Sequence, residues 1–206
     1  SYIFREIVEL AKEEKPDALV IAGDIYDKAI PSAEAVGVFD QFVLTLKKEL
    51  PDMGVYLGRE IYYRSEVLDD LDKLQEKAMC GSDTVLIEFS PNVEEEKVRS
   101  AVLDVIMTGY HPIVAHVERY VCTVKNWDYI YELKQLGADI PVNASSVTGD
   151  NGWSVQRCVK ALLKDHVVDY IASDAHDTTS RTPQLSKCYK YIVKKYGVEY
   201  ADRIMK

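Results

Sequence analysis

The sequence predicts an α/β fold in which parallel strands alternate with helices, arranged as an incomplete or distorted (β/α) barrel. Two observations predict this fold. Short apolar or β-branched runs recur along the 206-residue chain and end in polar residues, and segments with helical spacing of apolar residues lie between them. Helical crossovers of this length connect parallel strands, and the 47% hydrophobic content is enough for a sizeable core.

The amino-terminal elements are expected to be a helix, a strand and a helix. Apolar residues recur at helical spacing between residues 2 and 14, and the step into Pro16 disfavours further helix. The run "ALVIAG" at residues 18–23 is typical of a strand that is buried on both faces. Ser32 then predicts an N-cap, with a helix that continues to about residue 49.

Five further strands are predicted downstream, each a short run that ends in polar residues: "GVYLGREIYY", "TVLIEFS", "HPIVAHVERY", "DIPVNASS" and "DYIASDAH". The helices between them are predicted at residues 66–78, 94–108, 127–136, 154–164 and 184–196. Six strands joined by right-handed crossovers favour a barrel over an open sheet.

The composition limits the classes of function. The formal net charge of -9 repels phosphate backbones, which disfavours nucleic acid as a partner. The chain has neither an apolar run of 18 residues nor an opening basic segment followed by an apolar one, so we expect no membrane span and no signal peptide. Four widely separated cysteines are typical of reduced thiols in the cytoplasm, and none of them opens the C-x5-R loop of thiol phosphatases.

Polar side chains at the strand ends suggest a site. Glu60, Glu88 and His116 follow successive strands at equal spacing, since 88 − 60 and 116 − 88 are both 28, and Asp174 with His176 follow the last strand. Because the carboxyl ends of parallel strands share one face, these five side chains are expected to converge. Their oxygen and imidazole donors suit Mn, Fe, Zn or Mg, and they lack the thiolates of a structural zinc site.

Each of these residues also has an ordinary structural interpretation. Glu88 could form a strand-end salt bridge, His116 could be a hydrogen-bonded core histidine, and Asp174 with His176 could form an N-cap and turn. Five such groups at one end of four strands are harder to explain in this way, because neighbouring acids repel one another unless cations lie between them.

Two arginines follow the predicted ligands. Arg119 lies three residues after His116, and Arg181 lies five residues after His176, each in a loop beyond a strand. Guanidinium groups match phosphate oxygens in a bidentate way, so these residues favour a phosphate ester as the substrate. The alternative for each arginine is a surface salt bridge.

From about residue 54 to residue 206 the chain resembles the PHP-type protein-tyrosine phosphatases of bacterial capsule and exopolysaccharide loci, the CpsB/YwqE family. The matching stretches are "LGREIYYRSEVLDDL", "GSDTVLIEFSP", "GYHPIVAHVERYVC", "VNASSVTG" and "IASDAHDTTSRTPQL". The resemblance implies a distorted, barrel-like β/α fold that holds a three-metal cluster, in a family whose members often form homo-oligomers.

The resemblance also implies roles for the site residues. Glu60, Glu88, His116, Asp174 and His176 would bind two or three Mn²⁺ ions, while Arg119 and Arg181 would engage the substrate phosphate. The activity would be metal-dependent hydrolysis of a phosphate monoester, without a cysteine nucleophile. The substrate would be phosphotyrosine on the tail of a bacterial tyrosine autokinase, and the role would be regulation of polysaccharide export.

The amino-terminal part departs from this family. PHP phosphatases begin with a strand that carries an HxH pair, whereas residues 1–53 contain no histidine. Instead, "PDALVIAGDIYDKAIPSAEAVGVFDQF" resembles the start of SbcD, a calcineurin-like metallophosphoesterase of the SbcCD nuclease, and Asp24 would be a metal ligand there. On this interpretation the chain is a chimera, with an SbcD-like segment at residues 1–50 docked on a PHP-like domain at residues 51–206.

Two alternatives to an active phosphatase therefore remain. One is a fragment of an SbcD-like, metal-dependent DNA nuclease, which predicts DNA binding that weakens steeply with salt. The other is a catalytically impaired chimera or partner-binding module in which the metal cluster is incomplete.

Overall fold

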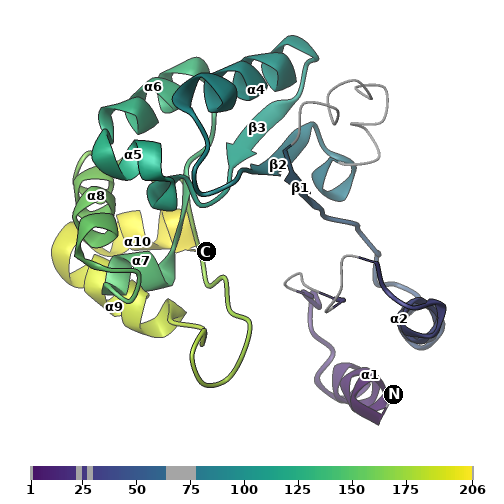
Figure 1. Ribbon diagram of the computed structural model, residues 1–206. Coiled ribbons are helices and arrows are strands. Elements are labelled where there is room, and N and C mark those ends of the chain that lie inside the picture. Colours follow the sequence, from purple (N-terminus) through teal and green to yellow (C-terminus); the bar gives the residue numbers. More distant parts are fainter. Residues whose placement is uncertain (1, 22–24, 27–29, 64–77, 206) are drawn as a thin grey trace. The chain divides into compact units, whose positions relative to one another are not determined.

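The computed structural model describes residues 2–21, 25–26, 30–63 and 78–205 (Figure 1). The chain divides into two compact units, Ser1–Leu57 and Gly58–Lys206. Each unit has its own cluster of buried hydrophobic side chains.

The first unit contains the two predicted helices, α1 (Tyr2–Glu14) and α2 (Ala33–Glu49). The two helices pack through aromatic side chains, and the rings of Phe4 and Phe42 stack with their centroids 4.3 Å apart. Ser32 caps α2 as predicted, because its Oγ accepts a hydrogen bond of 3.2 Å from the backbone N–H of Ala35.

The predicted strand at residues 18–23 is not formed where the structure describes it. Residues 18–21 have no strand conformation, and the side chain of Val20 is 81% exposed. An isolated strand leaves its backbone N–H and C=O groups without partners, and the described part of this unit is otherwise helix and loop. Residues 22–24, and with them the predicted ligand Asp24, lie outside the described residues.

The second unit contains the five predicted downstream strands, all in parallel pairs. One sheet has the order β1 (Glu60–Tyr62), β2 (Thr84–Glu88) and β3 (His111–Val114), and the other pairs β4 (Pro141–Asn143) with β5 (Tyr170–Ala172). A parallel bridge between Ile113 and Asp139 connects the two sheets. The described strands thus follow one another in chain order, as in an incomplete β/α barrel.

Four long helices of this unit match predicted ones: α4 (Glu95–Met107), α6 (Asp128–Leu136), α8 (Trp153–Lys164) and α9 (Leu185–Tyr196). The sequence did not predict the shorter segments, which are η3 (Met79–Gly81), η4 (Val117–Arg119), α5 (Val121–Lys125), α7 (Ala144–Thr148) and α10 (Val198–Met205). Segments of three to eight residues contain too few turns to show a helical period. The helix predicted at residues 66–78 lies almost entirely outside the described residues.

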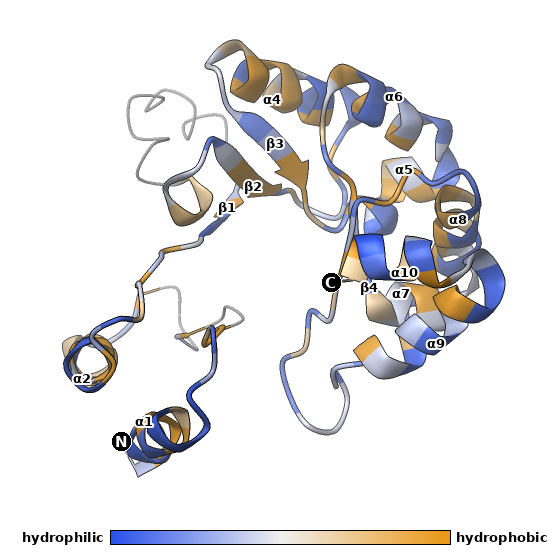
Figure 2. Ribbon diagram, turned by 180° about the vertical axis from the view of Figure 1, so that it is seen from behind, coloured by the Kyte–Doolittle hydropathy of each residue, from blue (hydrophilic) through white to orange (hydrophobic). Residues whose placement is uncertain are grey.

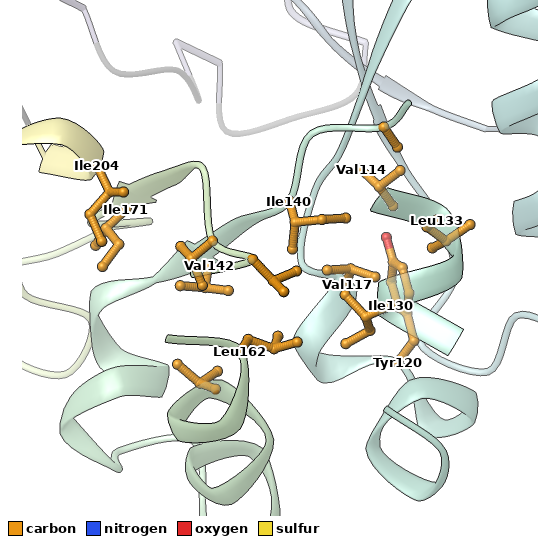
Figure 3. Packing of buried hydrophobic residues seen from close by; sticks show 14 of the residues in the cluster. Val114, Val117, Tyr120, Ile130, Leu133, Ile140, Val142, Leu162, Ile171 and Ile204 are labelled. Carbon is orange, nitrogen blue, oxygen red and sulfur yellow. The ribbon is translucent and has the colours of Figure 1, made fainter. Parts of the chain in front are cut away.

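The core of the second unit lies between the strands and the amphipathic helices. Val85 and Ile87 of β2 are buried, and the core continues through the residues labelled in Figure 3, from Val114 and Leu133 to Leu162 and Ile204. Figure 2 shows that the surrounding helices carry both hydrophobic and hydrophilic residues, as expected for helices with one face on a core. Over the described ranges, no helix has the length and apolar character needed to cross a lipid bilayer.

A charged network joins the two sheets where β3, β4 and β5 begin. Asp139 accepts hydrogen bonds from Lys134 Nζ at 3.0 Å and from the Tyr170 hydroxyl at 3.0 Å, and His111 Nε2 lies 2.9 Å from its second oxygen. Lys134 Nζ also donates to Asp169 at 2.7 Å. Burial by itself raises the pKa of Asp139, but the bonds from His111 and Lys134 outweigh it and lower that pKa.

We expect D139N to lower the free energy of unfolding at pH 7 by about 1–2 kcal/mol, the scale of a partly exposed charged hydrogen bond. Because folding lowers the pKa of Asp139, its contribution is present above its ordinary pKa of about 4 and is lost as the pH falls. Urea unfolding at pH 7 and pH 3 tests this. The difference between D139N and the wild type should be full at pH 7 and smaller at pH 3, while D83N, at an exposed position, should match the wild type at both. An equal difference at both pH values would contradict the assignment.

Candidate metal and phosphate site

The first three predicted ligands meet beside the three-stranded sheet. Glu60 pairs in register with Leu86, so its side chain lies on the same face of the sheet as Glu88, two residues further along β2. His116 Nε2 lies 3.5 Å from Glu60 Oε1 and 3.9 Å from Glu88 Oε1. The predicted position of Glu60 at the end of its strand was wrong, because β1 begins at Glu60. Its side chain nevertheless reaches His116.

Two of the predicted ligands have a left-handed backbone conformation. His116 follows β3 with φ 55°, and Asp174 follows β5 with φ 49°. Non-glycine residues rarely adopt such angles, and backbone strain of this kind is concentrated at functional sites. In both places the left-handed residue comes just after its strand, and its side chain lies against other candidate site residues.

Asp174 is the centre of the other half of the site. Its Oδ2 accepts hydrogen bonds from Arg119 Nη1 at 3.0 Å and from Arg181 Nη2 at 2.7 Å, and its Oδ1 lies 3.2 Å from His176 Nε2. Burial by itself raises the pKa of Asp174, but the neighbouring histidines and arginines outweigh it and hold that pKa below its usual range. Both predicted arginines therefore point toward the predicted metal ligands.

His116 is largely buried, and its environment favours a neutral imidazole. Burial and then the positive charge of Arg119 lower the pKa of His116, against the opposing effect of Asp174. A neutral imidazole keeps a lone pair with which it can bind a metal ion.

The donor set fits a divalent cation. Carboxylate oxygens and imidazole nitrogens are ligands for Mn, Fe and Zn, and the site gathers five side chains of these two kinds. Across the described ranges, no three His, Cys, Asp or Glu side chains already surround a single point in the way that a metal ion requires. Binding therefore requires side-chain rotation, for which the Glu60 side chain, 41% exposed, has room.

The loop that carries Arg181 is organised by Asp177. This loop leads from β5 to α9 and is yellow-green in Figure 1. Asp177 Oδ1 accepts hydrogen bonds from the backbone N–H groups of Thr179, Ser180 and Arg181 at 2.7, 2.6 and 3.1 Å. The hydroxyl and N–H of Ser180, with the neighbouring N–H groups, lower the pKa of Asp177. Sequence reasoning assigned Asp177 no role, although an aspartate before Thr-Thr-Ser is a turn signal.

Tyr120 was also missed, and it aligns the ends of β2 and β3. Its hydroxyl donates a hydrogen bond of 2.5 Å to the carbonyl oxygen of Ala115 and accepts one of 3.0 Å from the N–H of Phe89. These partners are the chain neighbours of His116 and Glu88. The buried phenol therefore holds two candidate ligands in register.

Comparison with known proteins finds similarity to one protein family and to individual tyrosine-protein phosphatases. A sequence profile described as "Capsular polysaccharide synthesis, CpsB/CapC" matches residues 6–206. Tyrosine-protein phosphatase CpsB of Streptococcus pneumoniae is 29% identical over 163 residues, which are 77% of this chain and 67% of the relative. Tyrosine-protein phosphatase YwqE of Bacillus subtilis is 28% identical over 160 residues, 78% of this chain and 63% of the relative.

A solved structure is also similar. It comes from work on YwqE of Bacillus subtilis and CpsB of Streptococcus pneumoniae, described as metal-dependent tyrosine phosphatases. It has a TM-score of 0.73 and 25% identity, and the match covers 96% of this chain and 81% of that one. The profile match begins at residue 6 and so includes the segment that resembles SbcD. These matches give the SbcD chimera no support.

Proposed function

We propose that this chain, which belongs to the CpsB/CapC family of capsular polysaccharide synthesis proteins, is a metal-dependent protein-tyrosine phosphatase. One observation of the structure carries the proposal. All seven candidate residues in the described part of the chain, which come from the start of β1, from the ends of β2, β3 and β5 and from the loops that follow, are joined through Asn143 by contacts of 2.7 to 3.9 Å. Asn143 completes this chain of contacts by bridging His116 and Asp174.

The proposed ligands are Glu60, Glu88, His116, Asp174 and His176, and the proposed ions are two or three Mn²⁺. Such ions, when bound, polarise phosphoryl oxygens and lower the pKa of water toward neutrality. Whether Asp24 contributes a further ligand is a separate part of the proposal, because Asp24 lies outside the described residues.

Arg119 and Arg181 would bind the phosphate. Their side chains are 32% and 47% exposed, so a substrate can reach both guanidinium groups from solvent. Two guanidinium groups that already converge on one carboxylate oxygen form a preorganised anion site, and such a site stabilises negative charge that grows on the transferred phosphoryl group.

The two buried cysteines of the chain, Cys158 and Cys188, are unsuited to nucleophilic catalysis. All four are free thiols, and burial raises the pKa of Cys158 and of Cys188 to about 12. A cysteine nucleophile needs the opposite shift, toward a thiolate at neutral pH. Free thiols also fit the reducing cytoplasm, where we propose that the protein acts on the phosphotyrosine-bearing tail of a tyrosine autokinase.

The proposal is tested by phosphate release from p-nitrophenyl phosphate and from a phosphotyrosine peptide, with metal-depleted protein and with added Mn²⁺. We expect turnover only with the metal, and faster turnover of the phosphotyrosine peptide than of its phosphoserine counterpart. Protein that binds Mn²⁺ but releases no phosphate from either p-nitrophenyl phosphate or the phosphotyrosine peptide would contradict the proposal and would favour a partner-binding module.

A further inference from the structure

We infer that Asn143 is a positioning residue, whose side-chain amide fixes Asp174 and His116 relative to each other and thereby sets the affinity of the site for metal ions. This inference rests on the proposed metal site and goes beyond the ligand set. Asn143 is the last residue of β4, and 5% of its surface is exposed. It therefore lies at the carboxyl end of β4, in contact with the candidate ligands His116 and Asp174.

The amide spans the two halves of the site. Its Nδ2 donates a hydrogen bond of 2.7 Å to Asp174 Oδ2 and lies 3.4 Å from His116 Nδ1. His116 follows a strand of the first sheet, and Asp174 follows a strand of the second. A single rigid amide thus relates ligands that belong to different sheets. Outer partners of this kind orient metal ligands, and their loss weakens metal binding.

The side chain of Asn143 does not cap helix α7, although the residue lies at the N-cap position. Asn143 is the N-cap residue of α7, and asparagine is among the preferred N-caps because its side chain can accept a hydrogen bond from the helix backbone. No such capping bond is formed here. The amide is directed instead to Asp174 and His116, which is an independent indication that the site determines its orientation.

The backbone of Asn143 is itself held by a buried carboxyl group. Glu118 Oε1 accepts hydrogen bonds from the N–H of Asn143 at 3.0 Å and from the hydroxyl of Ser146 at 2.7 Å. Glu118 has no exposed surface, and it lies in the chain between His116 and Arg119. The amide is therefore anchored to the segment that carries a candidate ligand and a candidate phosphate-binding residue.

The test uses the full chain and the substitutions N143L and N143A, with N151A as the matched control. Leucine has nearly the shape of asparagine but no hydrogen-bond donor, so N143L separates the loss of the hydrogen bond from the loss of volume. Asn151 also donates to α7, through Ser145 and Ser146, but makes no contact with the candidate ligands in the described part of the chain. Far-UV circular dichroism and thermal unfolding establish which variants fold, and N143A carries the test if N143L does not.

Calorimetric titration with Mn²⁺ should show about 10- to 100-fold weaker binding in N143L and N143A, and binding within about twofold of wild type in N151A. At saturating Mn²⁺, kcat for p-nitrophenyl phosphate should fall by a larger factor than KM rises, because the amide's contacts are with the candidate metal ligands Asp174 and His116. Folded N143L and N143A that bind Mn²⁺ as tightly as wild type would overturn the inference. The titration needs no turnover, so this result is distinct from failure of the proposed phosphatase activity.

Discussion

H116A should lose both metal binding and phosphatase activity, with kcat/KM for p-nitrophenyl phosphate reduced by about a thousandfold or more. His116 Nε2 lies within 4 Å of both Glu60 and Glu88, and His116 Nδ1 lies 3.4 Å from the Asn143 amide nitrogen. Removal of a ligand at this junction removes the metal's stabilisation of transition-state charge, which is worth several kcal/mol, and each 1.36 kcal/mol is a factor of ten in rate.

Two further variants make the result specific to the imidazole. H116N keeps a residue that tolerates the left-handed backbone of position 116 better than alanine does, so it separates backbone strain from ligand loss. H166A removes a histidine that is exposed and packs against Tyr200, and it should retain full activity. Activity in H116N near that of wild type would show that the imidazole is not needed.

R181A should lose about 10²- to 10³-fold in kcat/KM while it still binds Mn²⁺, and R119A should behave in the same way. The two guanidinium groups donate to the same oxygen of Asp174, and both are accessible to a phosphate. Their removal takes positive charge away from the candidate cation site, so the affinity for Mn²⁺ should stay the same or rise. Steady-state kinetics and calorimetric titration of the same preparations measure both quantities.

The conservative variant and a distant arginine complete this experiment. R181K keeps the charge but not the bidentate fork, so it should recover only part of the lost activity. R99A removes an arginine that pairs with Glu132, and it should have wild-type kinetics. If R119A and R181A lose metal binding together with activity, the arginines support the metal site and do not bind phosphate.

Local patterns in the sequence predicted most of the second unit. Alternating or continuous apolar runs located all five downstream strands, and the convergence of their ends brought together Glu88, His116 and Asp174. These predictions succeeded because each strand is a local feature and because parallel strands place their ends on a common side.

The errors have physical causes that a local pattern does not contain. The apolar run at residues 18–21 looks like a buried strand, but a strand also needs a neighbour for its backbone hydrogen bonds. The part played by Asn143 depends on contacts with residues 27 and 31 positions away, across two sheets. Glutamates are rarely fully buried, so the sequence alone would place Glu118 on the surface, but its side chain is completely buried in the structure. Such roles follow only from tertiary packing.

The central claim is that acids and imidazoles from separate strand ends bind cations together. Calorimetric titration of metal-depleted wild-type protein and H116A with Mn²⁺ tests this claim most directly. Wild type should bind at least two ions per chain, and H116A should bind fewer ions or bind them at least about tenfold more weakly. A wild-type protein that binds no Mn²⁺, or an H116A protein that binds as many ions with equal affinity, would contradict it.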